Sequence, residues 1–132
     1  MEAYRGRYSG LKVIFDSSFL IYICEKPSTL LSEMEEAIGK VEPLIPKPVL
    51  RELKALARRK RSAVLALEKA EKMEVVGCKG PADEAIVKLA KDLGLPVATL
   101  DLKLASLLRK EGIAYFTAKD DHLVTVGRPA LR

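Results

Sequence analysis

Residues 11–20, LKVIFDSSFL, contain the pattern on which the fold prediction depends. The first five residues are mostly apolar and rich in β-branched side chains, which is typical of a buried strand. The two serines after Asp16 can cap a short helix, which we expect to run to about Glu25. The stretch therefore predicts a strand that ends on a carboxylate and leads directly into a helix.

The same alternation of strand and helix continues toward the end of the chain. Short apolar runs predict further strands at 43–46, 73–78, 97–100 and 113–117. Helical periodicity, with glycines and prolines at the boundaries, predicts helices at 28–38, 49–59, 81–93 and 102–110. A further helical stretch follows residue 59 and extends through residue 72. Residues 1–10 and 118–132 have no clear pattern. This alternation predicts an α/β fold with a mainly parallel sheet and helices on both of its faces.

The composition narrows the class of protein. With 132 residues, 48% of them hydrophobic, the chain has the usual size and core content of one domain, so we expect a single domain over 1–132. The apolar run at 11–15 is too short for a membrane span or a secretory signal, which predicts a soluble, cytoplasmic protein with no membrane contact. The formal charge of +5 favours an anionic partner such as nucleic acid.

The sequence is poor in soft metal ligands. The two cysteines, Cys24 and Cys78, form no CxxC pair, and His122 is the single histidine. A zinc site or a disulfide framework would need more cysteine or histidine residues than these. We therefore expect both cysteines to be small buried apolar side chains. We expect His122, which follows Asp120 and Asp121, to lie in a surface loop.

Three acids fall at the predicted ends of strands. Asp16 directly follows the first strand, Asp101 follows the fourth, and Asp83 lies in the first turn of the helix after the third. Because the carboxyl ends of parallel strands meet at one edge of a sheet, we expect these side chains to lie close together. Each acid alone has a simpler interpretation as a helix cap or a first-turn acid.

Two of the acids fall on helix faces where charge is unusual. On a helical wheel Asp83 lies on the apolar face with Ile86 and Ala90, and Glu52 lies at the margin of a buried stripe, four residues before Leu56. Carboxylates are rarely buried unless they are paired or bound to a cation. Four acids without a nearby histidine or cysteine suit Mg²⁺ or Mn²⁺, and such an ion can activate water for phosphodiester hydrolysis.

Several basic residues lie close to Glu52 in the sequence. On one continuous helical wheel, four cations fall within about one quadrant, and they could bind RNA phosphates: Arg51, Lys54, Arg58 and Arg61. An ordinary solvated helix face explains each of them equally well.

Together these motifs resemble the PIN-domain family over nearly the whole chain. The resemblance rests on the order Asp, Glu, Asp, Asp, on the 18-residue gap between Asp83 and Asp101, and on the segments DSSFL (16–20), VLREL (49–53), GPADEAI (80–86) and ATLD (98–101). It implies a three-layer α/β/α sandwich, Mg²⁺- or Mn²⁺-dependent endoribonuclease activity and, in many members, a homodimer. Asp16, Glu52, Asp83 and Asp101 would be metal ligands or catalytic acids, and Ser17 and Thr99 would support them by hydrogen bonds.

Several roles stay open within this resemblance. The VLREL segment followed by basic residues looks most like the ribosomal-RNA-processing subgroup, whereas the length also suits VapC-type toxins, which have an antitoxin partner. A catalytically weak PIN module that binds RNA or a ribosome-assembly partner is a further alternative. A receiver-type phosphorylation switch would need an aspartate after the third strand, where this chain has Gly77 and Cys78.

Overall fold

The computed structural model describes residues 10–26 and 29–129. Within them one sheet has the strand order β3-β2-β1-β4-β5-β6, in which the first five strands are parallel and β6 is antiparallel to β5. The strands are β1 (Leu11–Phe15), β2 (Val41–Pro46), β3 (Glu74–Val76), β4 (Val97–Ala98), β5 (Tyr115–Lys119) and β6 (His122–Val126). The helices are α2 (Ser17–Glu25), α3 (Leu30–Ile38), α4 (Lys47–Leu56), α5 (Arg61–Ala70), α6 (Ala82–Leu93) and α7 (Leu102–Lys110). The predicted α/β class is confirmed.

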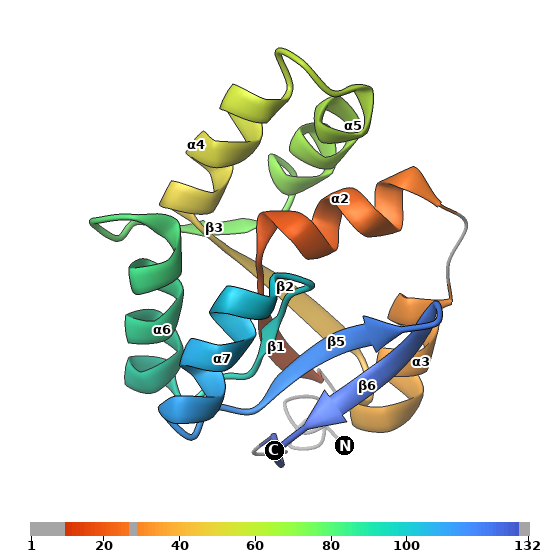
Figure 1. Ribbon diagram of the computed structural model, residues 1–132, viewed down its shortest axis with the longest axis vertical. Coiled ribbons are helices and arrows are strands. Elements are labelled where there is room, and N and C mark those ends of the chain that lie inside the picture. Colours follow the sequence, from red (N-terminus) through yellow and green to blue (C-terminus); the bar gives the residue numbers. More distant parts are fainter. Residues whose placement is uncertain (1–9, 27–28, 130–132) are drawn as a thin grey trace, which may run out of the picture.

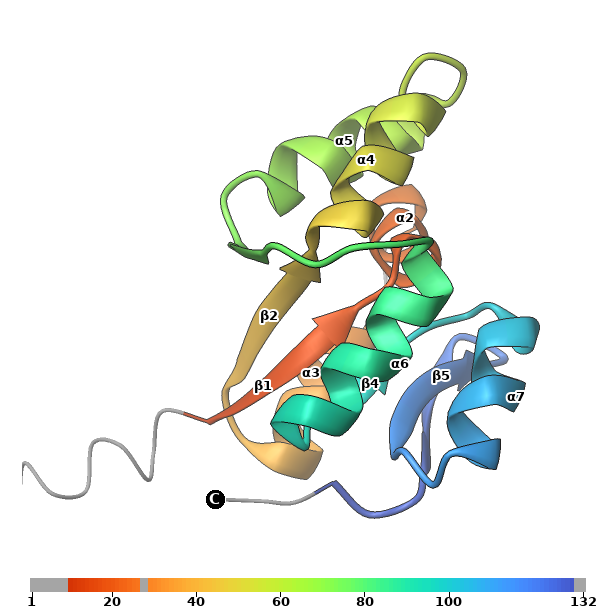
Figure 2. The same cartoon turned by 90° about the vertical axis from the view of Figure 1, so that its left-hand side faces the viewer.

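Helices cover both faces of the sheet (Figures 1 and 2). The helices α6 and α7 pack together on one face, and α3 packs against β2 and β6 on the other. A third group, formed by α2, α4 and α5, packs together beyond the carboxyl ends of β1 and β2 (Figure 1). The predicted α/β/α sandwich is therefore present, with a helical cap over one edge of its sheet.

The first strand is the centre of the core. Val13, Ile14 and Phe15 are fully buried, as expected for a parallel strand covered on both faces. After β1 the chain adds β2 and β3 on one side and later returns to place β4 on the other. The crevice beyond the carboxyl ends of two such neighbouring strands is where open α/β sheets bind ligands. Asp16 directly follows β1 at this point.

Residues 115–126 contain more regular secondary structure than we predicted. Strand β5 extends to Lys119, and β6 pairs with it, so His122 begins a strand instead of lying in a loop, although its side chain is exposed. Asp120 and Asp121 form the two-residue turn with φ of 53° and 64°. Positive φ at both central positions is the geometry that hairpins favour. We missed the hairpin because Asp-Asp is a weaker turn signal than Asn-Gly.

Other boundaries also differ. The helix predicted from Val49 begins at Lys47, because Pro48 is tolerated in a first helical turn, and it ends at Leu56. Both cysteines are half-buried and free, not fully buried as predicted, and burial raises the pKa of the Cys24 thiol. Among the described residues, no helix has the length and apolar character needed to cross a membrane.

Candidate active site

All four predicted acids line one cavity of about 400 Å³ at the carboxyl edge of the sheet. Asp16 comes from the end of β1, Glu52 from α4, Asp83 from the first turn of α6, and Asp101 from the start of α7. Residues far apart in the sequence thus meet beyond the carboxyl ends of neighbouring strands. The other lining residues are Ser17, Ser18, Ile21, Tyr22, Glu25, Leu56, Lys60 and Leu100.

Asp16 does not behave as a helix cap. It occupies the position before α2, but its side chain does not cap that helix. Instead its Oδ2 atom accepts hydrogen bonds from the Ser18 hydroxyl at 2.7 Å and from the Thr99 hydroxyl at 2.8 Å. Only 3% of Asp16 is exposed. The carboxylate is therefore held in place by side chains and does little for the helix beside it.

The same two hydroxyls join β4 to Asp16. The backbone N–H of Leu100 donates to the Ser18 oxygen at 2.9 Å, and that of Asp101 donates to the Thr99 oxygen at 3.0 Å. A hydroxyl has one proton to donate and lone pairs to accept with, so both can serve Asp16 while accepting from the main chain. The network places the start of α7 relative to the end of β1.

Both hydroxyls that we expected to support the acids donate hydrogen bonds to them. Thr99 supports Asp16, whereas Ser17 donates to Glu52 Oε1 and so connects α2 to α4. Ser18 was not among the predicted residues. Its signal was its position two residues after an acid at a helix start, where a serine oxygen commonly makes local bonds. Glu52 itself lies on an exposed part of α4.

Asp101 does serve as a helix cap. Its Oδ1 atom accepts from the N–H groups of Lys103 at 2.8 Å and Leu104 at 3.2 Å, at the first turn of α7. The simpler interpretation from the sequence is therefore correct for this residue. Both capping bonds end on one oxygen, so Asp101 combines a structural role with its place in the cavity wall.

Asp83 carries the electrostatic evidence for a cluster. Burial raises the pKa of its carboxyl, and the charges of Asp101, Asp16 and Glu52, in that order, raise it further, while Lys103 lowers it. Asp83 lies in the first turn of α6, where the helix dipole alone would favour the charged form. All three other acids are thus close enough to oppose ionisation at this position.

A family model described as "PIN like domain" matches residues 13–120, which include all four acids. The chain belongs to this family. The PIN-like domain matches no curated protein. Among solved structures it resembles the PIN domain endonuclease Utp24, with a TM-score of 0.73, 23% identity, and 92% of this chain and 95% of that chain covered. It also resembles a domain of a functionally unknown protein from Methanocaldococcus jannaschii, with a TM-score of 0.59, 19% identity, and 83% and 91% covered.

The cavity of the PIN-like domain offers the kind of ligand atoms that a hard cation prefers. Its acids supply carboxylate oxygens only, which Mg²⁺ and Mn²⁺ prefer. In the part of the chain that the structure describes, no group of three acid, histidine or cysteine side chains is arranged so that it could hold a metal ion. Proteins commonly hold Mg²⁺ through one or two carboxylates, with water as the remaining ligands. The residues present therefore fit a water-rich divalent site.

The predicted basic stripe does not lie on one helix. Arg51 and Lys54 are on α4, Arg58 is in the turn after it, and Arg61 begins α5. The helix α4 ends at Leu56 because α5 folds back onto α2 and α4. Three small, fully buried side chains of α5 allow this close packing: Ala63, Ala66 and Ala70. All four cations are exposed. The turn brings a different cation, Lys60, to the cavity.

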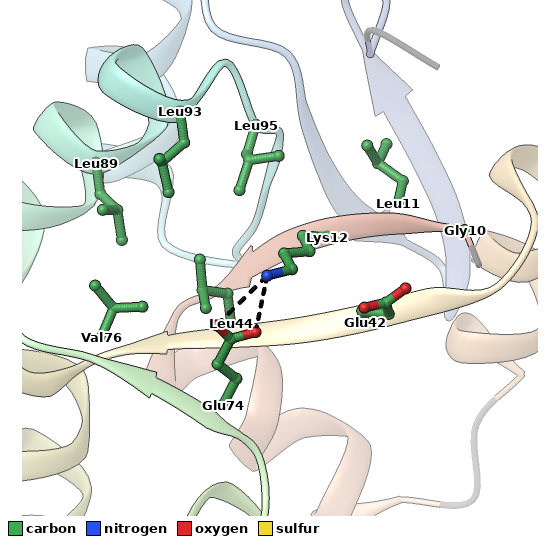
Figure 3. A pocket seen from close by; sticks show the side chains of 10 residues that line it. All are labelled: Gly10, Leu11, Lys12, Glu42, Leu44, Glu74, Val76, Leu89, Leu93 and Leu95. Atoms are coloured by element: carbon green, nitrogen blue, oxygen red, sulfur yellow. Dashed lines mark hydrogen bonds and ion pairs between the residues drawn. The ribbon is translucent and has the colours of Figure 1, made fainter. Parts of the chain in front are cut away.

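A larger cavity of about 580 Å³ lies under α6 at the opposite, amino end of the strands (Figure 3). Apolar side chains, among them Leu44, Leu89 and Leu93, line much of it. Lys12 and Glu74, which also line it, form an ion pair at 3.1 Å. Glu42 is the third charged side chain of the lining, so this cavity brings together two carboxylates where the acidic cavity has five. The chemistry of the PIN-like domain therefore belongs to the smaller, acidic cavity.

Proposed function

We propose that this PIN-like domain is a Mg²⁺- or Mn²⁺-dependent endoribonuclease that hydrolyses RNA phosphodiester bonds. The observation that carries the proposal is that four carboxylates line one cavity, in which burial and the charges of the other three oppose the ionisation of Asp83. Such a cluster is costly unless a cation binds it. The family assignment and the likeness to a PIN domain endonuclease support the same activity.

The four acids divide into ion ligands and a residue that can orient water. Asp16, Asp83 and Asp101 hold the ion or ions, and Glu52 binds the ion or orients the attacking water. When bound, the ion supplies a Lewis acid for the phosphoryl oxygen and a water of lowered pKa. The hydroxyls of Ser18 and Thr99 keep Asp16 in one orientation, because both donate to the same oxygen. Such positioning matters because a misplaced reacting group slows the reaction.

The surface beside the cavity favours RNA as the substrate. Four exposed cations on α4, at the turn and on α5 attract the RNA backbone: Arg51, Lys54, Arg58 and Arg61. The sequence motifs favour ribosomal RNA processing in the cytoplasm, and a VapC-type toxin with an antitoxin is the second setting. In both, residues 1–132 act as one PIN-like domain that can pair as a homodimer.

One observation favours a different function. The described residues contain no group of three potential ligands arranged to hold a metal ion, which suits a catalytically weak module that binds RNA or a ribosome-assembly partner. A circular single-stranded RNA separates these functions, because only an endonuclease can open it. We expect the wild type to linearise it with Mn²⁺ and not with EDTA. Binding without cleavage would favour the weak module.

The control uses two matched substitutions. Asp16→Asn removes a charge from the cavity, and Asp92→Asn makes the same change on the exposed side of α6, where Asp92 pairs with Lys88 at 3.1 Å. We expect Asp16→Asn to abolish cleavage and Asp92→Asn to cleave like the wild type. Cleavage by Asp16→Asn at the wild-type rate would overturn the proposal.

A further inference from the structure

The acidic cavity has one cation in its described lining. Lys60 lines it together with five acids, namely the four discussed above and Glu25. Lys60 was not among the cations that the sequence analysis selected. Its place in the cavity wall raises the question of which anion its ammonium group binds during the reaction.

The main chain holds Lys60 firmly between two helices. Its N–H donates to the carbonyl of Leu56 at the end of α4, at 2.9 Å. Its carbonyl accepts from Ala63 at 3.1 Å and Val64 at 3.3 Å in the first turn of α5. Lys60 is therefore the extended residue that precedes α5, with φ of −126° and ψ of 125°. Only its side chain is free to change partners.

The present partner of the ammonium group holds it weakly. Nζ lies 3.8 Å from Oε2 of Glu25, and the two side chains are 53% and 41% exposed. An exposed ion pair of this kind contributes little to stability. Ser62 also donates to Oε2 of Glu25, at 3.1 Å, so Glu25 keeps a hydrogen bond when the ammonium group leaves. An ammonium group held so loosely can move to a stronger acceptor, and phosphate is one.

The position of the pair indicates which phosphate this is. Glu25 ends α2, and Asp16 precedes it, so nine residues of helical rise separate their Cα atoms by about 13 Å. An ammonium group beside Glu25 is thus displaced along α2 from the carboxylate cluster, where the proposed cleavage occurs. Neighbouring phosphates of an RNA strand lie closer together than this separation, so the ammonium group is placed for a phosphate that flanks the scissile one and not for the scissile phosphate itself.

We propose that Lys60 leaves Glu25 to bind an RNA phosphate that flanks the scissile one, on the α2–α5 side of the cavity. The inference rests on the proposed function, since it takes RNA as the substrate. Lys60 offsets the repulsion that the acids exert on the incoming strand. Glu25 competes with the RNA for the same ammonium group and so weakens RNA binding.

Two substitutions break the same ion pair with opposite consequences for RNA. Lys60→Gln removes the cation, whereas Glu25→Gln removes its competitor. We expect Lys60→Gln to weaken binding of a labelled oligouridylate about 10-fold, the effect of one lost charge-assisted hydrogen bond. It should also reduce the slope of binding against salt by about 0.7, the value for one phosphate contact on a single strand. Glu25→Gln should tighten binding, and Lys60→Arg should retain it.

Binding is measured by fluorescence anisotropy in EDTA, which separates this inference from the nuclease proposal. Lys72→Gln is the matched control, because Lys72 is exposed in the turn after α5 and away from the cavity lining. Equal loss of melting temperature in Lys60→Gln and Glu25→Gln, with RNA binding unchanged in both, would show that the pair only anchors helices and would overturn the inference. Normal cleavage by the wild type with that result would leave the nuclease proposal intact. Absence of RNA binding by the wild type in EDTA would overturn the inference, while cleavage with Mn²⁺ would test the nuclease proposal separately.

Discussion

Replacing Asp83 with asparagine distinguishes a functional carboxylate cluster from an ordinary first-turn acid. The substitution keeps the size and shape of the side chain and removes its charge. In the native protein that charge is opposed by burial and by Asp101, Asp16 and Glu52. It is favoured by the dipole of α6, in whose first turn Asp83 lies. The two influences predict stability changes of opposite sign.

The two contributions to the free energy of unfolding are similar in size and opposite in sign. The sign of the measured change therefore shows which contribution is larger. Loss of the dipole interaction costs about 0.3–1 kcal/mol. Relief of the raised pKa is worth about 1.4 kcal/mol for each pKa unit, and solvent screening reduces this because Asp83 is only half-buried. We expect a net change between about zero and 1 kcal/mol in favour of Asp83→Asn, which raises the melting temperature by at most about 5 °C in a domain of this size.

The pH dependence is the sharper test. Because the pKa of Asp83 is raised in the folded state, its neutral form favours folding below the unfolded pKa of about 3.9. That stability is lost as pH rises through the folded pKa. Asp83→Asn cannot lose it. The melting temperature of the variant minus that of the wild type should therefore increase from about pH 4 to about pH 7.5.

The assay pairs thermal melts in EDTA at both pH values with cleavage of single-stranded RNA in Mn²⁺. We expect stability to be retained or improved in Asp83→Asn while cleavage is lost, a combination expected for a site in which function opposes stability. A dipole role alone predicts a deficit that grows with pH, together with normal cleavage. That result would remove Asp83 from the site and refute the cluster.

Three further outcomes test the remaining parts of the site. Millimolar Mn²⁺ should raise the wild-type melting temperature by mass action, and no shift at any concentration would contradict a metal site. Arg58→Ala combined with Arg61→Ala should reduce the salt slope of RNA binding by about 1.4, and an unchanged slope would make both ordinary surface residues. Thr99→Val should cost about 1–3 kcal/mol in denaturant unfolding and slow cleavage, because it removes a bond to Asp16 and leaves the Asp101 N–H unpaired. Normal cleavage by Thr99→Val would contradict its positioning role.

The sequence predicted the elements that have strong local signals. The strand at 11–15 and the helix after it are consistent with their patterns, and the acids at the strand ends line one cavity because parallel strands share a carboxyl edge. The hairpin through Asp120 and Asp121 was missed because its strands are half-exposed and its turn residues are uncommon. Local patterns describe single elements and contain little about such pairings.

Tertiary packing explains what was missed in the site. The end of α4 at Leu56 follows from the packing of α5, whose buried alanines resemble an ordinary helical pattern until their partners are known. This turn separates the predicted stripe and places Lys60 at the cavity. A helical wheel assumes a continuous helix, so it could not reveal either result.

The support of Asp16 by Thr99 shows why sheet order matters for the site. Phe15 pairs with Ala98 in the parallel register of β1 and β4, so the next residues, Asp16 and Thr99, leave the sheet side by side. A shift of β4 by one residue would place Leu100 beside Asp16 and turn the hydroxyl to the other face. The sequence contains both residues, but their contact depends on β4 pairing with β1 across the intervening elements. The carboxylate cluster is therefore a product of the register of the whole sheet, and a change that shifts β4 should abolish the site even with all four acids retained.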